Sequence, residues 1–109
     1  MLIRIWTVGL TPGKGQELEV FANTKSLSML RARPGCVGVM FTRTDTQCVT
    51  ITAWMSEEAI LAAEASHEYA EVVRQIESSG LLADNHSTEV LTVYGGFAAE
   101  PLLQALKCD

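Results

Sequence analysis

The chain has 109 residues, of which 48% are hydrophobic and 19% are charged, and its formal net charge is -5. This length allows one domain with a real core but leaves no room for a second. Basic residues cluster only at Arg31 and Arg33, which argues against nucleic acid as a partner. No apolar run reaches the roughly 20 residues that span a bilayer, so we expect no membrane partner.

The N-terminus and the cysteines favour a cytoplasmic protein. Residues 1–10 are too short and too interrupted for a secretory signal. Cys36, Cys48 and Cys108 are odd in number and lack metal-type spacing. Cys36 and Cys48 fall on two strands of a predicted hairpin, some seven residues out of register, which separates them by roughly 23 Å. A disulfide needs Cα atoms within about 7 Å, so we expect free thiols.

The first half of the chain predicts a strand, a helix and a hairpin. Alternating residues rich in Ile, Trp and Val indicate a strand over residues 2–10. Helical spacing follows from Gly15 to about Arg33, where Pro34 ends the helix. Two strands over 36–42 and 48–54 then flank a polar turn. Because cross-strand partners share a side, one face of this hairpin is expected to hold Val37, Val39, Phe41, Arg43, Cys48, Thr50, Thr52 and Trp54.

The second half predicts capped helical segments and a final strand. Ser56 and Ser66 are expected N-caps of two helical segments, the second of which closes at Gly80. Residues 81–87 are expected to form a loop, and residues 89–94 a fourth strand. Pro101 is well placed to open a short last helix that runs through Lys107.

This order of elements is β-α-β-β-α-β, which predicts an α+β, ferredoxin-like fold with a four-stranded antiparallel sheet. We expect residues 1–96 to form the domain and residues 97–109 a C-terminal extension. The strands carry apolar residues on both faces, for example Trp6 and Val8 against Ile3 and Ile5. Since two helices cover only one face, we expect the other to pack against a second copy in a homodimer.

Several residues are candidates for a ligand site. Trp54 ends its strand just before a helix cap, where an aromatic side chain either fills the core or lines a pocket. His67, in the first turn of a helix, is either a surface residue or a proton acceptor beside an apolar cavity. Asn23 either offers a hydrogen bond or is exposed, and Tyr69 is either core or reaches a ligand. His86 is expected to be solvated.

The sequence resembles the antibiotic biosynthesis monooxygenase family of dimeric α/β-barrel proteins. The likeness covers about residues 2 to 94. It is carried by Thr11-Pro-Gly-Lys14 after the first strand, Pro34-Gly-Cys-Val-Gly38 before the second, Trp54-Met-Ser-Glu-Glu-Ala59 after the third, and Ser66-His67.

The resemblance implies an oxygenation without metal, flavin or other cofactor. In this chemistry a deprotonated hydroquinone, phenol or anthrone itself reduces O₂ inside an apolar pocket. Trp54 would line the pocket with Phe41, Thr50 and Thr52. His67 would act as the base, and Asn23 or Tyr69 would supply hydrogen bonds.

The sequence argues against one branch of the family and leaves one alternative function open. The family also includes haem-degrading proteins, which have an asparagine on the first strand and a tryptophan and a histidine on the second helix. Here the first strand has no asparagine, and Ala63 and residues 72–74 stand where that tryptophan and histidine would be. The alternative function is a non-catalytic dimeric module that binds a small apolar ligand, because fold alone does not fix function.

Overall fold

The computed structural model describes residues 1–106, except for the side chain of Asp84. Its elements in chain order are β1 (Leu2–Leu10), α1 (Gly15–Phe21), the π-helical turn η1 (Ala22–Ser26), α2 (Leu27–Arg31), β2 (Cys36–Arg43), β3 (Gln47–Trp54), α3 (Glu57–Glu64), α4 (His67–Ser78), β4 (Leu82–Thr92) and α5 (Glu100–Ala105).

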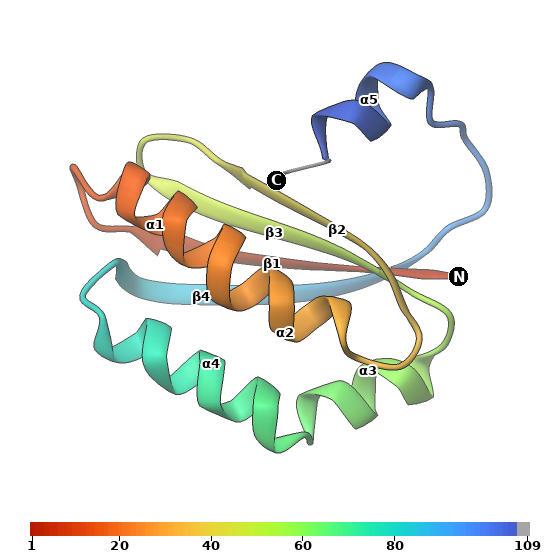
Figure 1. Cartoon of the computed structure of the whole chain (residues 1–109), viewed down its shortest axis with the longest axis horizontal. Helices are drawn as coiled ribbons and strands as arrows, with labels where there is room; N and C mark the ends of the chain where they lie inside the picture. Colours follow the sequence, from red (N-terminus) through yellow and green to blue (C-terminus); the bar gives the residue numbers. More distant parts are fainter. Residues whose placement is uncertain (107–109) are drawn as a thin grey trace.

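The strands form one antiparallel sheet in the order β2-β3-β1-β4, with α1 to α4 on one face (Figure 1). The predicted ferredoxin-like α+β fold is therefore confirmed. The core between sheet and helices divides into two clusters of buried side chains. One is built from Val8, Leu10, Leu18, Cys48 and Ile76, and the other from Leu30, Trp54, Ile60 and Ala63.

The predicted register of the β2–β3 hairpin is confirmed over most of its length. Phe41 pairs with Thr50, and Arg43 pairs with Cys48. The prediction is wrong at the far end, where an irregularity between Cys36 and Gly38 pairs Cys36 with Trp54. Such a bulge adds one residue to a strand and turns it out of the alternation, so Val37 is 54% exposed. Cys36 therefore takes the predicted place of Val37 and packs against the Trp54 cluster.

The fourth strand begins earlier than predicted, at Leu82, so the expected loop over 81–87 is wrong. Its Asp, Asn, His and Ser residues are typical of a loop, but their backbone pairs with the free edge of β1. Leu82 pairs with Leu10 and His86 with Val8, and the ladder is irregular between them. The backbone of Asn85, in the irregular part of the ladder, adopts a left-handed conformation with a φ of 73°. Tertiary pairing therefore overrides local composition here.

The helix predicted from Gly15 to Arg33 contains the π-helical turn η1 at its centre. Thr24 in this turn donates its hydroxyl hydrogen to the Val20 carbonyl oxygen at 2.6 Å. Ala22 at the start of η1 is buried and Ser26 at its end is partly buried, whereas the three residues between them are exposed. Single π-turns widen a helix and are frequent at functional sites.

The predicted caps of α3 and α4 are confirmed, whereas α5 ends at Ala105, before the predicted Lys107. The Ser56 hydroxyl accepts the Ala59 amide hydrogen and the Ser66 hydroxyl accepts that of Tyr69, each at 3.2 Å. Gly80 follows α4 with a φ of 81°, a conformation that suits glycine. Pro101 lies in the first turn of α5, as predicted, whereas Lys107 and Cys108 lie outside the described residues.

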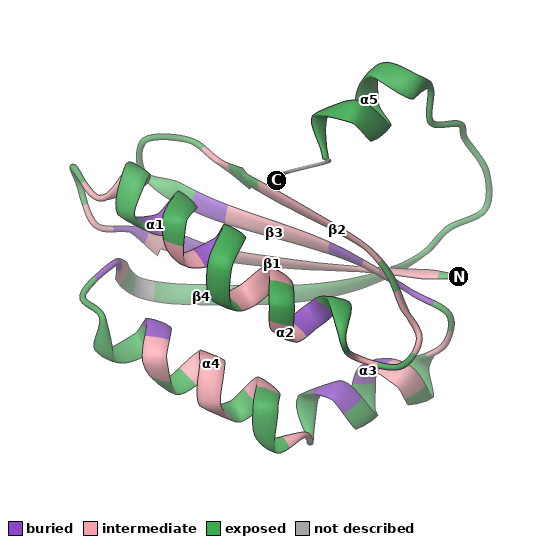
Figure 2. Ribbon diagram, viewed as in Figure 1, coloured by how far each residue is buried: buried purple, intermediate pink, exposed green. Residues whose placement is uncertain are grey.

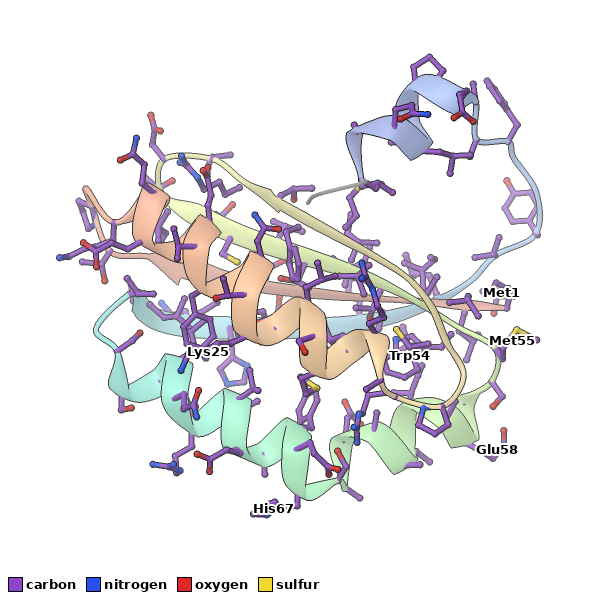
Figure 3. The ribbon with its side chains drawn as sticks, in the orientation of Figure 1. Met1, Lys25, Trp54, Met55, Glu58 and His67 are labelled. Atoms are coloured by element: carbon purple, nitrogen blue, oxygen red, sulfur yellow. The ribbon has the colours of Figure 1, made fainter. Side chains whose placement is uncertain are left out.

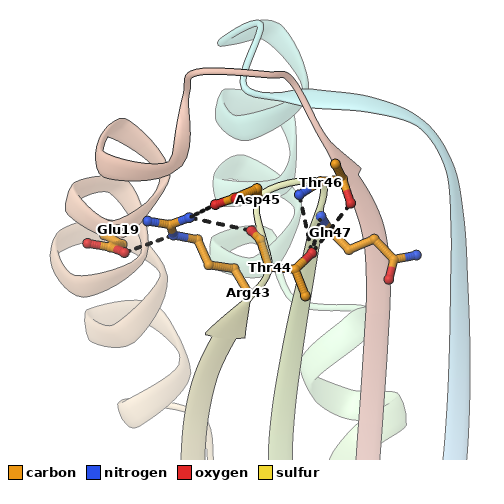
Figure 4. Close-up of polar contacts among 6 residues, drawn as sticks. All are labelled: Glu19, Arg43, Thr44, Asp45, Thr46 and Gln47. Atoms are coloured by element: carbon orange, nitrogen blue, oxygen red, sulfur yellow. Dashed lines mark hydrogen bonds and ion pairs between the residues drawn. The ribbon is translucent and has the colours of Figure 1, made fainter.

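Arg43 fastens the β2–β3 turn to α1 (Figure 4). Its Nε donates to Glu19 Oε2 at 2.8 Å, and its Nη1 lies 3.8 Å from Asp45 Oδ1. Within the turn, the Thr44 hydroxyl accepts the Gln47 amide hydrogen at 3.0 Å. These contacts give Arg43 a structural role at the surface.

The face of the sheet that α1 to α4 leave uncovered carries Ile3, Ile5, Met40 and Ile51, all partly exposed. The segment between β4 and α5 is also exposed (Figure 2), and within it Tyr94 is 100% and Phe97 is 94% exposed to solvent. Cys36 and Cys48 are free thiols, as predicted. Within residues 1–106, no helix is both long and apolar enough to cross a membrane.

Candidate active site

A cavity of about 470 Å³ lies between the sheet and the helices. Side chains of all four strands, of η1 and of α1 to α4 line it, and it extends between the two core clusters. Its volume falls within the usual range for a small-molecule site. The cavity brings together five residues proposed from the sequence: Trp54, Phe41, Thr50, Thr52 and Tyr69.

The other two proposed residues lie elsewhere. His67, at the start of α4, is exposed and points away from the sheet (Figure 3), and it does not line the cavity. Asn23, on η1, is exposed and borders a smaller cavity of about 300 Å³ between the first helical segments and β2. Neither side chain is therefore placed to act inside the large cavity.

Trp54 is held in the cavity wall by a chain of hydrogen bonds. Its indole Nε1 donates to the Thr52 hydroxyl at 2.7 Å, and this hydroxyl donates to the Arg4 carbonyl oxygen at 3.4 Å. Both side chains are only 2% exposed. Since the indole N–H is already paired, Trp54 presents its apolar ring to a ligand, and Thr52 serves mainly to orient that ring.

Cys48 is a buried part of the same wall. Its Sγ lies 3.9 Å from the Thr50 hydroxyl oxygen. Burial raises the pKa of the Cys48 thiol, and the contact with Thr50 opposes this only in part. The side chain therefore stays a neutral thiol near neutral pH and behaves as a small apolar residue.

Arg4 is a cavity residue that the sequence analysis missed. It is on β1, and its guanidinium lies under the junction of α3 and α4. Nε donates to Glu64 Oε2 at 3.1 Å, and Nη2 donates to the Tyr69 hydroxyl oxygen at 3.0 Å. Arg4 could have been found from the sequence, because it is a cation between Leu2 and Trp6 at an inward-facing position of an apolar strand.

His86 is exposed, as expected from the sequence, and it also lines the cavity. It pairs with Val8 across the β1–β4 ladder and thus faces the helices. His86 was not proposed as a site residue because its segment was predicted to be a loop. Arg4 and Val8 are four residues apart on β1, so Arg4 and His86 are separated by about 13 Å of strand.

Over residues 1–106, the His, Cys, Asp and Glu side chains form no group of three that could hold a metal ion. The cavity wall is mainly apolar. Its polar side chains are those of Arg4, Ser26, Thr50, Thr52, Glu64, Tyr69, Glu77, Asn85, His86 and Thr88.

Comparison with known proteins gives structural matches only. No protein-family model matches the chain, and no curated protein matches its sequence. SnoaB from Streptomyces nogalater, described as a cofactor-independent oxygenase and solved as a mutant, aligns with a TM-score of 0.70 at 17% identity, over 90% of this chain and 97% of its own. A structure described as an antibiotic biosynthesis monooxygenase aligns with a TM-score of 0.66 at 14% identity, over 87% and 100%.

The chain has the fold of the antibiotic biosynthesis monooxygenases. A further match is Rv0793 from Mycobacterium tuberculosis, with a TM-score of 0.70 at 17% identity, over 89% of this chain and 98% of its own. The resemblance found in the sequence is thus confirmed at the level of the fold. At these identities the likeness establishes the fold alone, and function rests on the cavity of this chain.

Proposed function

We propose that this protein is a cofactor-independent monooxygenase that uses O₂ to oxygenate an electron-rich aromatic such as a hydroquinone, phenol or anthrone. The observation that carries the proposal is the cavity of about 470 Å³, with Trp54 in its mainly apolar wall. Such a cavity binds a fused-ring aromatic by its faces and keeps a reactive intermediate away from water. The similar fold of SnoaB supports this choice of chemistry.

For an anthrone, the reaction balances without another reductant. A base removes a proton from the ring methylene, and the resulting carbanion passes one electron to O₂. The substrate radical and superoxide then combine, and protonation gives a hydroperoxide. Loss of water from the C–H and O–OH groups leaves a quinone carbonyl, so one oxygen atom enters the product and the other leaves as water.

The proton acceptor has to reach the cavity. His67 is the residue that the family resemblance suggests, but its side chain points away from the sheet. His86 lines the cavity, and the chain contains only these two histidines. We therefore assign the role of base to His86, since a neutral imidazole accepts protons near physiological pH.

Homodimerisation through the uncovered face of the sheet is part of the proposal. The partly exposed Ile3, Ile5, Met40 and Ile51 form a contiguous apolar surface on three neighbouring strands. Packing of one such sheet on another removes this surface from water. The dimer would leave the cavity in each subunit on the opposite side of its sheet.

The test is oxygen uptake above the rate in buffer, with a panel of anthrones and hydroquinones. The wild type should consume O₂ with at least one of them. His86→Ala should lower kcat by about 100-fold or more, as loss of a general base commonly does. His67→Ala removes a histidine outside the cavity and should keep wild-type turnover.

Loss of turnover in His67→Ala with normal turnover in His86→Ala would overturn the assignment of the base. Absence of uptake with every substrate, together with tight binding of an aromatic in the cavity, would instead favour a non-catalytic binding module.

A further inference from the structure

We infer that Arg4 and Tyr69 form an oxyanion subsite in the cavity, which selects aromatic ligands that carry an ionised oxygen atom, such as a phenolate or enolate. The inference deepens the proposed function and rests on it for the reaction. Binding of the anion, however, is a property of the cavity that does not depend on turnover.

The guanidinium of Arg4 is a largely buried cation. The Arg4 side chain is 13% exposed, and Glu64, its only carboxylate partner among the described residues, is 37% exposed. A guanidinium in a mainly apolar wall is costly unless its charge is well compensated. Because Glu64 is itself partly solvated, its carboxylate compensates the charge of Arg4 only in part. A second negative charge in the cavity would complete the pairing.

Arg4 also has N–H donors that no described residue accepts. A guanidinium has five N–H groups, and the described residues accept only two of them, at Glu64 and Tyr69. No buried side-chain N or O atom among the described residues lacks a partner. Because Arg4 Nη1 has no hydrogen-bond partner among these residues, it must be open to water or to a ligand.

The Tyr69 hydroxyl is a further donor beside Arg4. It accepts a hydrogen from Nη2 of Arg4 at 3.0 Å, and none of the described residues accepts its own hydrogen. Arg4 and Tyr69 both line the cavity. Two neighbouring donors, one of them charged, are the usual way to bind an oxyanion, and they stabilise charge that develops on a substrate oxygen.

The position of the pair fits the chemistry proposed above. About 13 Å of strand separates Arg4 from His86, and the rings of Trp6 and Trp54 line the cavity near Arg4. An elongated fused-ring substrate would place its acidic oxygen at Arg4 and extend toward His86. A neutral aromatic of the same shape would gain the contacts with the rings but not those with the two donors.

The test uses a dye pair that differs only in the acidic oxygen: 4-nitro-1-naphthol, whose ionisation changes its visible spectrum, and its methyl ether. Binding to the full-length protein is measured by equilibrium dialysis, and ionisation by absorbance against pH. Wild type should bind the naphtholate about tenfold or more tighter than the ether. The pH at which half of the bound dye is ionised should then lie about one unit or more below the corresponding pH of the free dye.

Four variants separate an oxyanion subsite from a general effect of charge. Arg4→Gln should abolish the preference for the naphtholate, and Tyr69→Phe should lower it by about three- to tenfold. Glu64→Gln should increase it, because a competing carboxylate is removed. Arg74→Gln also removes one positive charge, but from the exposed face of α4, and should leave the preference unchanged.

Equal affinity of the wild type for dye and ether, or ionisation of the bound dye at the same pH as the free dye, would overturn the subsite whatever the variants do. Normal dye binding without oxygen uptake for any substrate would remove the proposed function and keep the subsite. If the protein consumes oxygen but Arg4→Gln leaves the dye preference intact, the proposed function stands and the subsite is overturned.

Discussion

The Thr52 hydroxyl has two hydrogen-bonding neighbours in the wall of the cavity, the Trp54 indole and the Arg4 carbonyl. Thr50 lies two residues earlier on the same face of β3, but its hydroxyl contacts only the Cys48 sulfur, a weak partner. The two threonines therefore form a matched pair, similar in position but different in hydrogen bonding.

Thr52→Val should lower the free energy of unfolding by about 1–3 kcal/mol, because the buried Trp54 N–H loses its acceptor. Thr50→Val should change it by less than about 1 kcal/mol, since no strong hydrogen bond is lost. Urea unfolding followed by tryptophan fluorescence measures both. A larger effect at Thr50 than at Thr52 would contradict the assigned role of the Thr52 hydroxyl.

At the residue scale, the sequence predicts part of the candidate site. Phe41, Thr50, Thr52 and Trp54 could be placed together because alternate residues of a hairpin share one face. The inward position of Arg4 on β1 follows from the same rule and could also have been found. Its contacts with α3 and α4 could not, because local patterns do not say how a helix pair sits on a sheet.

At the scale of elements, the turn from α2 into β2 depends on close packing against α3. Gly35 has a φ of 82°, and a Cβ built there would lie 2.5 Å from the Cβ of Ala59. Gly80, after α4, has nearly the same φ of 81°, but no atom lies within 4 Å of such a Cβ. The two glycines share a backbone strain and differ in the available space.

Gly35→Ala should lower the free energy of unfolding by about 2–5 kcal/mol, because strain at positive φ adds to overpacking. Gly80→Ala should lower it by only about 1–2 kcal/mol, since strain acts alone. Urea unfolding of the two variants gives the difference. Equal destabilisation would show that the contact with Ala59 relaxes at no cost.

Elements whose signals are local were predictable, and those fixed by tertiary pairing were not. The starts of α3 and α4 and the end of α4 followed from the sequence, because the residues that cap them, Ser56, Ser66 and Gly80, are of types that favour these positions. The start of β4 did not, because residues 82–88 form a strand by pairing with β1. The η1 turn has no composition that marks it within a continuous helical pattern.

At the scale of the whole molecule, the two-faced apolar strands are the feature that argues for a dimer. Ile51 lies near the middle of the uncovered face, paired with Ile5 on one side and Met40 on the other. A charge there would be costly if that face is buried between two subunits. Val20, on α1, is 65% exposed on the helical side and serves as a control position.

Sedimentation at micromolar concentration should give the mass of two chains for the wild type. Ile51→Lys should shift the protein to the mass of one chain, whereas Val20→Lys should leave the dimer intact. The mass of a single wild-type chain, or an intact dimer in Ile51→Lys, would contradict dimerisation through this face.

The central claim is that the cavity beside Trp54 and Arg4 oxygenates its substrate with O₂, and isotope labelling tests it most directly. Under oxygen-18 gas, turnover of an anthrone by the wild type should place one labelled oxygen atom in each quinone product and one in water. Mass spectrometry should show this above the background of a reaction without protein. Product formation no faster than in buffer, or a new carbonyl oxygen that comes from water, would contradict the account.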